Sequence, residues 1–372
     1  MNIGIVLRFA SAEEGGVHTF EMSLVESVAR LQHECRHKFH LVTGIRNITD
    51  TGVIYPLPRH DIGQHTGKAS GLDFLWYLTP VAELQDYPYV VAPFDLQHRI
   101  NPHFPEVSAG GEWKGREELF RNLLPRATRI FACNERGRQE MIDFYQVLPR
   151  SVSILPHPTP TDCLKPVSET LGEETRRKFG LPAGYLLYPA QFWAHKNHVL
   201  ILRSIAWLKE QHGIGISVAF VGSDKGNLPY LKRVASRLGI EPLVYFPGFV
   251  SRSELIGLYK GALALSYTSY FGPENLPPLE AMALGCPVIC TRFDGAVEQL
   301  GDAACLVDLA DPSDLGNAVL RVKQDQAYRE SLVAAGRKRA TSWTSDDFAR
   351  RAFRVFDELE PMRLCWDNSV WK

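Results

Sequence analysis

Short apolar runs alternate with amphipathic segments along most of this chain, and that alternation restricts the fold more than any other feature of the sequence. The first run covers residues 2–8, and the segment after it repeats apolar residues at helical spacing. Four further runs have the character of buried strands: residues 39–43, 89–92, 129–133 and 152–155. Helical patterns at residues 117–124 and 135–145 lie between them. This order predicts a parallel sheet with helices on both faces.

Residues 156–183 interrupt the alternation with several prolines and a run of charges, and we interpret their first half as a linker between domains. Strand and helix patterns then resume and continue to the end of the chain. We therefore predict an α/β protein of two doubly wound parallel sheets. Its expected parts are a domain at residues 1–165, a second domain at 166–345 and a C-terminal helix within 346–372. Two such sheets that face each other place a binding cleft at the carboxyl ends of their strands.

Composition excludes several classes of protein. A formal net charge of −1 over 372 residues provides no global attraction to nucleic acid or to an anionic membrane. Seven scattered cysteines without a CxxC motif favour reduced thiols in a cytoplasmic protein over a disulfide framework or a zinc site. Because the chain start is too short and uncharged for a signal peptide, and apolar runs stay below membrane-spanning length, any membrane contact is expected to be peripheral, at the inner face.

Residues 270–290 carry the densest chemical signal. Pro277 and Pro278 fit the first turn of a helix, where a missing N–H costs little, and Gly285 stands where a left-handed C-terminal cap belongs. The start of a helix attracts phosphate through its unpaired N–H groups and its dipole. Glu274 and Glu280 flank this start, and a carboxylate there can accept hydrogen bonds from two neighbouring sugar hydroxyls. The segment indicates a sugar-nucleotide site, with an ordinary solvated loop–helix junction as the alternative.

Glycines and a lysine occupy earlier strand-to-helix junctions. Gly15 and Gly16 follow the first apolar run, where glycine lets the backbone approach a phosphate or a sugar closely. Lys196, in the segment AQFWAHKNH, precedes a helix and suits a diphosphate as a point charge. A tight turn at the glycines and a surface turn at the lysine are the structural alternatives.

Two more strand ends carry candidates for the same site. Gly222 ends the run FVGSD, and Phe249 and Val250 follow the strand in FPGFVSRSEL. The backbone N–H and C=O groups of Phe249 and Val250 can read the edge of a base. Packing of their side chains against the neighbouring helix is the alternative.

Taken in order, the motifs GG, AQFWxHKNH, VGS, PGFVSxxEL and GPENLPPLEAMALGCPVI resemble those of the family 4 retaining glycosyltransferases, which have the GT-B fold of two Rossmann-like domains. The resemblance covers nearly the whole chain. It implies that Lys196 neutralises the diphosphate of a nucleotide-sugar donor without a metal ion or another cofactor, and that Glu280 binds the ribose hydroxyls. The other implied donor contacts come from the backbone: Asn275 and Leu276 at the phosphate or sugar, Phe249 and Val250 at the base.

The sequence departs from the family pattern at three positions. The first of the family's paired glutamates falls at Gly272, and Glu274 two residues later is its candidate replacement in catalysis. Gln191 stands among the donor-binding positions where the family has an arginine, which removes a positive charge from the diphosphate site. Phe94 stands where the family has a histidine. These departures motivate a rival hypothesis, a GT-B protein that binds a sugar nucleotide without transferring the sugar.

The sequence DLQHR, after residues 89–92, brings Asp95, His98 and Arg99 together and resembles a subset of the family with this loop beside the transferred sugar. His98 can hydrogen-bond a sugar hydroxyl, Asp95 can orient the sugar or the acceptor hydroxyl, and Arg99 can stabilise the departing diphosphate. We expect Asp95 and His98 to act in catalysis with Lys196 and Glu274. An Asp–His–Arg network that only braces the loop is the alternative.

The sequence therefore predicts an enzyme that moves a sugar from a nucleotide-sugar to an acceptor hydroxyl. By the resemblance, the anomeric configuration is retained and the donor's own phosphate oxygen helps deprotonate the acceptor. The expected acceptor is a growing bacterial surface polysaccharide or its lipid-linked precursor, without nucleic acid as a partner. Besides the binding-only rival, a sugar-nucleotide epimerase is an alternative. A dehydrogenase is disfavoured because the first strand is not followed by a GxGxxG motif.

Overall fold

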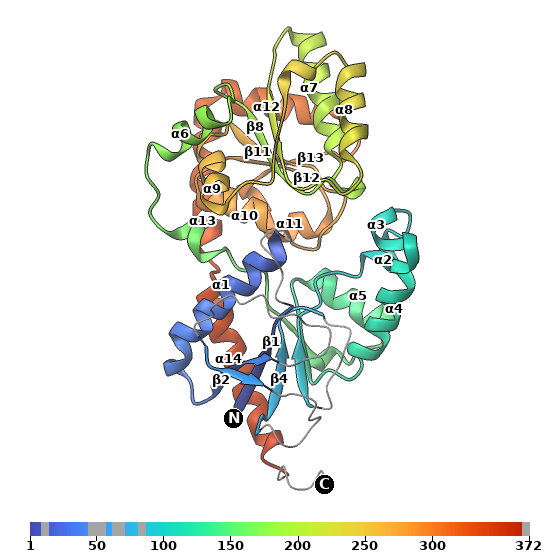
Figure 1. Cartoon of the computed structure of the whole chain (residues 1–372), viewed down its shortest axis with the longest axis vertical. Coiled ribbons are helices and arrows are strands. Elements are labelled where there is room, and N and C mark those ends of the chain that lie inside the picture. Colours follow the sequence, from blue (N-terminus) through green and yellow to red (C-terminus); the bar gives the residue numbers. More distant parts are fainter. Residues whose placement is uncertain (9–14, 44–56, 62–70, 81–86, 367–372) are drawn as a thin grey trace. The chain divides into compact units, whose positions relative to one another are not determined.

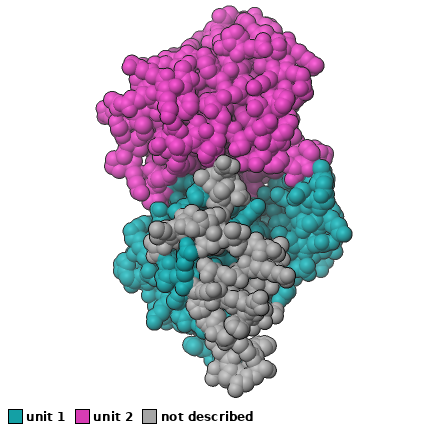
Figure 2. All heavy atoms as spheres, viewed as in Figure 1, with its two compact units in different colours: residues 1–102, 107–160, 343–372 teal, residues 103–106, 161–342 magenta. Residues whose placement is uncertain are grey.

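The computed structural model describes residues 1–8, 15–43, 57–61, 71–80 and 87–366. The chain divides into two compact units, coloured separately in Figure 2. Unit 1 comprises residues 1–102, 107–160 and 343–372, and unit 2 comprises residues 103–106 and 161–342. The main boundaries thus fall at 160/161 and 342/343, where the sequence predicted 165/166 and 345/346.

Unit 1 is built on a seven-stranded sheet, in which the described strands follow the order β3-β2-β1-β4-β5-β6-β7 and every pair is parallel; Figure 1 labels β1, β2 and β4. The strands are β1 (Asn2–Val6), β2 (Lys38–Thr43), β3 (Arg59–Asp61), β4 (Phe74–Tyr77), β5 (Tyr89–Val91), β6 (Arg129–Ala132) and β7 (Val152–Ile154). The five strands predicted in this part of the chain are confirmed. β3 and β4 were not predicted; β3 consists of three polar residues, which give no apolar strand pattern.

The helices of unit 1 are α1 (Gly16–Leu31), α2 (Gln97–Ile100), α4 (Glu112–Leu123), α5 (Glu135–Tyr145) and α14 (Ser345–Arg363); α3 (Pro105–Ser108) lies at the junction of the two units' residue ranges. α1 buries the predicted apolar stripe, including Phe20 and Leu24. α14 begins with a capping box at Thr344 and lies against α1 (Figure 1). Its Phe356 packs on Trp76 of β4 at a ring-centroid distance of 5.5 Å, so the end of the chain completes the core of unit 1.

Unit 2 is built on a six-stranded parallel sheet, with the described strands in the order β10-β9-β8-β11-β12-β13. The strands are β8 (Leu186–Pro189), β9 (Val218–Val221), β10 (Val244–Gly248), β11 (Ala264–Tyr267), β12 (Val288–Thr291) and β13 (Cys305–Val307). Its helices are α6 (Leu171–Lys178), α7 (His198–His212), α8 (Leu228–Arg237), α9 (Arg252–Gly261), α10 (Leu276–Ala283), α11 (Asp294–Leu300), α12 (Pro312–Gln324) and α13 (Gln326–Thr341). The predicted second alternation of strands and helices is confirmed.

The strand order of each sheet reverses at one place. In unit 2 successive strands spread outward from β8 in one direction and from β11 in the other, so β8 and β11 flank a topological switch point. In unit 1 the corresponding pair is β1 and β4. Ligands of open α/β sheets bind at the carboxyl ends of such strands. The residues that follow β8 and β11 are therefore the first place to look for a site in unit 2.

Two sequence-based expectations concern the whole chain. All seven cysteines are free thiols, and Cys133, Cys163, Cys286 and Cys290 are buried, as predicted for reduced structural thiols. Within the described ranges, none of the helices combines the length and the hydropathy needed to cross a bilayer.

Candidate functional site

Lys196 is held at the switch point of unit 2. It ends the short 3₁₀ turn η6 (Ala194–Lys196) that follows β8, while Tyr267 is the last residue of β11. The Lys196 Nζ donates a hydrogen bond to the Tyr267 hydroxyl at 3.1 Å. At its other end, the Lys196 carbonyl oxygen accepts a hydrogen bond of 2.7 Å from the hydroxyl of Tyr188 in β8. The two tyrosines therefore orient the lysine at the edge of the sheet where a ligand is expected.

The start of α10 is linked to the same lysine. Asn275 is the N-cap residue of α10, and its Oδ1 accepts a hydrogen bond of 2.6 Å from the Tyr267 hydroxyl. Gln299 of α11 holds the backbone of Asn275 from the other side, accepting from its N–H at 3.0 Å and donating to its C=O at 2.9 Å. We call Lys196, Tyr267, Asn275 and Gln299 the helix-start cluster. It joins four elements of unit 2, η6, β11, α10 and α11, through neutral hydroxyl and amide groups and one ammonium.

The first turn of α10 offers fewer amides than the sequence suggested. An α-helix begins with four N–H groups that lack an intrahelical partner. In α10 the N–H of Asn275 already donates to Gln299, and Pro277 and Pro278 have none. Of the first four N–H positions in this described turn, the N–H of Leu276 is what remains for a ligand. The predicted donor contact by the amide of Asn275 would require the Gln299 hydrogen bond to break, whereas the contact predicted for Leu276 meets no such obstacle.

Gly272 is required by local packing. Its φ is +130°, and a Cβ atom there would lie 2.5 Å from Asn275 Oδ1. A glutamate at this position, as in the family pattern, would displace the Asn275 side chain, which donates to the Gly272 carbonyl at 3.2 Å. Glu274 is 8% exposed, so its carboxylate lies largely inside unit 2. The loop around Gly272 therefore disfavours a side chain at position 272, and Glu274 as the replacement stays a prediction.

Glu280 is buried and belongs to an ion network whose other charged members are half-buried. One carboxylate oxygen accepts from Arg252 Nη1 at 2.7 Å and the other accepts from the Tyr259 hydroxyl at 2.9 Å. Asp162 binds the far side of the same guanidinium at 2.6 Å and 2.9 Å. Burial opposes the charge of Arg252, but the attraction of Glu280 and Asp162 prevails and raises the pKa of the arginine. Because a carboxylate has about four acceptor positions, Glu280 keeps capacity for further donors despite these bonds.

The remaining donor-binding candidates of unit 2 differ in their surroundings. Gly222 has no room for a side chain, since a Cβ atom would lie 2.5 Å from the carbonyl oxygen of Ala190. Gln191 Oε1 accepts from the indole Nε1 of Trp193 at 2.8 Å. Phe249 is 51% exposed after β10, while Val250 is buried in the core of the unit. Phe249 thus presents an exposed ring after β10, and the donor contacts of all four residues stay predictions.

His98 is fully buried in unit 1. Its Nε2 lies 3.3 Å from a carboxylate oxygen of Glu117 and 3.0 Å from the Tyr145 hydroxyl, and its ring stacks on Phe120. Burial outweighs the effect of Glu117 and lowers the pKa of His98, so the imidazole is neutral near pH 7. These contacts are those of the bracing alternative. A sugar hydroxyl would reach this ring only after the packing around it opened.

Glu117 binds Arg99 of the DLQHR segment as well as His98, together with two residues from outside the segment. Arg99 donates to both of its carboxylate oxygens, and Arg121 donates at 2.6 Å. The Tyr145 hydroxyl donates at 3.0 Å. The hydrogen bond from Arg99 is the largest cause that lowers the pKa of Glu117 to about 2. We call Glu117, His98, Arg99, Arg121 and Tyr145 the Glu117 cluster.

Asp95 belongs to a separate pair in unit 1. Its Oδ1 accepts from Arg116 at 3.1 Å and from the backbone N–H of Gln97 at 3.0 Å, which fixes the start of α2. Asp95 and Arg99 are both half-buried. The single Asp–His–Arg network considered from the sequence is therefore two networks, one around Glu117 and one between Asp95 and Arg116.

Gly15 and Phe94 complete the candidates of unit 1. Gly15 has a φ of +67° and caps α1, where its carbonyl oxygen accepts from Thr19. Gly16 is the first residue of that helix, and the stretch 9–14 before it lies outside the described residues. Phe94 packs edge-on against Phe20 and His157 at centroid distances of 5.6 Å and 5.3 Å. An aromatic contact thus replaces the histidine of the family pattern.

Glu106 contacts His195, next to Lys196. Residues 103–106 belong to unit 2, and one carboxylate oxygen of Glu106 accepts from the His195 backbone N–H at 2.8 Å and also contacts its ring Nδ1. The ring of His195 stacks on Phe271 at 4.0 Å. Burial opposes ionisation of Glu106, but the hydrogen bonds from His195 lower its pKa. The spacing in the sequence gave no sign of this contact, since 89 positions separate its partners.

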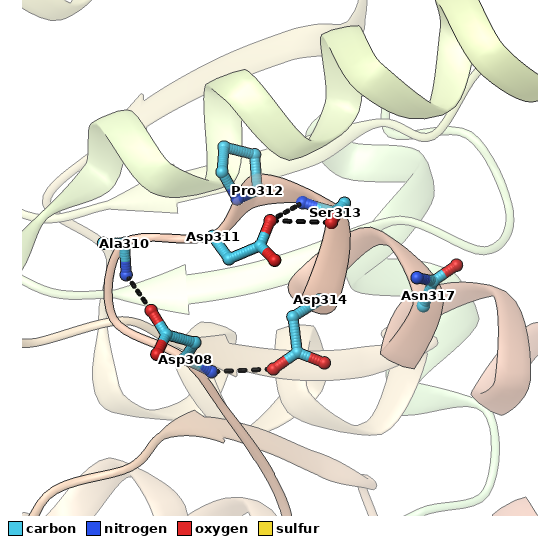
Figure 3. Close-up of a pocket in the computed structure, with 7 residues that line it drawn as sticks. All are labelled: Asp308, Ala310, Asp311, Pro312, Ser313, Asp314 and Asn317. Carbon is cyan, nitrogen blue, oxygen red and sulfur yellow. Dashed lines mark hydrogen bonds between the residues drawn. The ribbon is translucent and has the colours of Figure 1, made fainter.

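An acidic pocket lies at the start of α12 (Figure 3). Its lining includes three aspartates, whose carboxylates bind nearby groups of the same loop: Asp308 accepts from Ala310, Asp311 from Ser313, and Asp314 from the backbone of Asp308. Like charges of this kind repel a diphosphate, so the pocket is not a nucleotide-sugar site. The described residues also hold no group of three or more His, Cys, Asp or Glu side chains arranged to bind a metal ion.

Among the comparisons with known proteins, the match to a family model lies within unit 2. Residues 173–339 match the family model of glycosyl transferases group 1. The chain is 26% identical to the D-inositol 3-phosphate glycosyltransferase of Corynebacterium jeikeium over 260 residues, which are 67% of this chain and 62% of the relative. It is 24% identical to the O-antigen chain mannosyltransferase B of Escherichia coli over 298 residues, 74% of this chain and 76% of that protein. The chain thus spans about three fifths of the length of the inositol-phosphate relatives.

Solved structures resemble nearly the whole chain. The sucrose-phosphate synthase of Thermosynechococcus elongatus aligns with a TM-score of 0.74 at 16% identity, covering 97% of this chain and 100% of the other. The Anabaena protein Alr3699/HepE, solved with UDP and glucose, also aligns with a TM-score of 0.74, at 15% identity, covering 96% of this chain and 100% of the other. At such identities the likeness concerns the fold. It confirms the predicted α/β fold of GT-B type, with two Rossmann-like parallel-sheet domains.

Proposed function

We propose that this chain is a retaining glycosyltransferase that moves a sugar from a nucleotide-sugar donor to an acceptor hydroxyl without a metal ion. One observation carries the proposal: within the region that matches the glycosyl transferases group 1 model, an ammonium group is tied to the start of α10 at the switch point of the sheet. A cation beside a helix N-terminus suits the two negative charges of a diphosphate.

In this proposal Lys196 takes the role of the metal ion. Its half-buried Nζ faces the diphosphate, and the N–H of Leu276 supplies one directed hydrogen bond. Charge develops on the diphosphate as the bond to the anomeric carbon breaks, so a fixed cation there lowers the barrier. The acceptor oxygen forms the new bond, and its proton passes to an oxygen of the departing phosphate. Because Gln191 adds no positive charge, Lys196 contributes more of the charge stabilisation of the diphosphate than it would beside an arginine.

Glu280 is the proposed ligand of the donor ribose. Its bonds to Arg252 and Tyr259 leave acceptor positions for two hydroxyls. Arg252 also keeps the side chain in place, since it bridges Glu280 and Asp162. The exposed ring of Phe249 suits stacking against a base.

The acceptor is proposed to be a saccharide, free or linked to lipid. The E. coli relative is an O-antigen chain mannosyltransferase, which supports an acceptor in surface polysaccharide synthesis. A lipid-linked acceptor would bring the chain to the membrane surface as a peripheral protein.

The decisive experiment begins with a binding panel of UDP, GDP, ADP and TDP, with UDP first because the Anabaena neighbour was solved with it. The sugar nucleotide of the tightest base is then incubated with candidate acceptors, and the products are analysed for transfer, hydrolysis and epimerisation. Transfer with retained anomeric configuration that persists in EDTA supports the proposal. Transfer that stops in EDTA refutes metal independence.

A second candidate function is binding without transfer. It is favoured by the crowding at Gly272 and by the uncharged Gln191, which together remove two charged groups of the family pattern. Tight nucleotide binding with no turnover on any acceptor would support it, whereas epimerised donor without an acceptor would identify an epimerase.

A further inference from the structure

Tyr267 joins the two halves of the helix-start cluster. Its hydroxyl accepts a hydrogen bond from Lys196 Nζ at 3.1 Å and donates one to Asn275 Oδ1 at 2.6 Å. A phenol has one proton, and here that proton is directed at the amide oxygen. A lone pair of the phenol oxygen therefore accepts from the ammonium. Each hydrogen bond in the series from Lys196 through Tyr267 to Asn275 thus has a defined donor and acceptor.

The phenol keeps that proton. Tyr267 is 2% exposed, and burial raises its pKa far above the ordinary value. A neutral hydroxyl orients the ammonium without cancelling its charge, which an ion pair in the same position would do. This hydrogen bond is therefore suited to a cation that must still meet an anionic ligand.

Helix α11 fixes Asn275, the last member of this series of hydrogen bonds. Gln299 binds both backbone groups of Asn275, at 3.0 Å and 2.9 Å. Gly295 brings the same helix so close to the loop that a Cβ atom would lie 2.1 Å from the carbonyl oxygen of Pro273. Asn275 thus offers Tyr267 an acceptor that cannot easily move.

We propose that Tyr267 is a positioning residue for Lys196, which holds the ammonium beside the first turn of α10 in the direction that a diphosphate needs. The inference rests on the proposed function, in which Lys196 binds the donor diphosphate. A lysine side chain loses rotamer entropy when it is ordered. Tyr267 orders it before the ligand arrives, so that less of this cost falls on binding.

The test is Tyr267→Phe, measured by calorimetry with two probes: the tightest-binding diphosphate of the UDP, GDP, ADP and TDP panel, and its parent nucleoside. We expect the variant to bind the diphosphate about five- to tenfold more weakly and the nucleoside unchanged, because only the phosphates meet Lys196. With a donor and an acceptor, KM for the donor should rise more than kcat falls.

Tyr185→Phe is the matched control. Tyr185 is also fully buried in unit 2, and its hydroxyl likewise donates to an uncharged acceptor, the backbone oxygen of Leu258, away from the cluster. We expect it to lower the melting temperature as Tyr267→Phe does and to leave both affinities unchanged. Asn275→Ala is the second variant, since it removes the acceptor of the Tyr267 proton without altering the core, and it should weaken diphosphate binding selectively as well.

A double-mutant cycle with Lys196→Met decides whether Tyr267 acts through the lysine. In the Lys196→Met background, we expect Tyr267→Phe to weaken diphosphate binding by less than a further twofold. The ammonium that Tyr267 positions is already absent there. Equal loss of both probes, no loss, or full additivity would overturn the inference, while wild-type binding and the Lys196→Met defect would still uphold the proposed function. Absence of diphosphate binding in the wild type would refute the proposed function itself and the inference with it.

Discussion

The Glu117 cluster of unit 1 and the helix-start cluster of unit 2 follow strands of similar sheets, yet they handle charge in opposite ways. Glu117 is 5% exposed, and its carboxylate is closed by two guanidinium groups, a hydroxyl and an imidazole. Lys196 is half-buried and is oriented by a neutral phenol that is tied to a helix start. A charge whose partners surround it braces a loop, whereas a charge that is oriented beside an open helix end can bind a ligand.

The largest expected effect tests the bracing half of this comparison. Glu117→Ala should lower the free energy of unfolding by about 3 kcal/mol, because it leaves Arg99 and the Tyr145 hydroxyl without their shared acceptor. Urea unfolding measures the change. Glu118→Ala is the control, since that neighbouring carboxylate is 63% exposed and pairs with the exposed Lys114. Equal stability of the two variants would contradict a brace at Glu117.

The pH dependence follows from the same residue. The pKa of Glu117 in the folded protein is lowered to about 2 from an ordinary 4.5. Its contribution to the free energy of unfolding is therefore complete above about pH 4.5 and is lost as the pH falls through 2. The stability difference between the wild type and Glu117→Ala should therefore shrink between these values. A difference that is constant down to pH 2 would mean that the carboxylate pKa is not shifted.

The next effect tests the binding half of the comparison. Lys196→Ala should weaken nucleoside diphosphate binding by about tenfold or more and leave the parent nucleoside unaffected, as expected for the loss of a charged hydrogen bond. Isothermal titration measures both affinities. Lys225→Ala is the control, because Lys225 is an exposed lysine of the same unit that lies over the ring of Trp193. Wild-type affinity in Lys196→Ala would remove the donor-site assignment.

Glu280→Ala should weaken nucleotide binding as much as Lys196→Ala does, or less, and the loss should concern the nucleoside and not the phosphates. We expect about tenfold weaker binding of the nucleoside itself, because the carboxylate is proposed to bind the ribose. The wild type should also prefer the ribonucleoside to its 2′-deoxy analogue, and the variant should lose this preference. Retained preference would assign Glu280 to the network with Arg252 and Tyr259 alone.

The smallest expected effect on the nucleotide site comes from His98→Ala. The buried ring and its contacts predict a stability loss of about 1–2 kcal/mol, with nucleoside diphosphate affinity changed less than about twofold. The transfer rate per folded molecule then separates the two interpretations of DLQHR. A retained rate fits the brace, whereas a lost rate with unchanged stability would restore the predicted contact with the sugar.

Much of the fold was predictable because periodicity is local. The stripe of Phe20 and Leu24 marks α1, and the glycine and proline signals around residues 277–287 mark the bounds of α10. The left-handed cap predicted at Gly285 is confirmed by its φ of +76°. β4 was missed although Phe74–Tyr77 is an apolar run of four buried residues, with Gly71 before it and Pro80 after it.

The contacts of the candidate site were less predictable. Motif spacing singled out Lys196 and Asn275, but Tyr267 read only as the end of an apolar run. Glu117 was hidden in a helical pattern, although it collects partners from positions 98 to 145. Gly272 looked like a lost glutamate until the structure showed the Asn275 side chain in the space that a Cβ atom would need. Side-chain partners distant in sequence leave no periodic signal.

The sequence by itself determined the α/β class, the order of strands and helices, and the chemical types present at the strand ends, because each of these depends on neighbours along the chain. Only the tertiary structure decided which of those polar residues are buried among one another, as His98 is, and which lie half-buried beside a helix start, as Lys196 does. That distinction depends on burial and on partners from other elements. It is why His98 and Lys196, both predicted as site residues, differ so clearly in their surroundings.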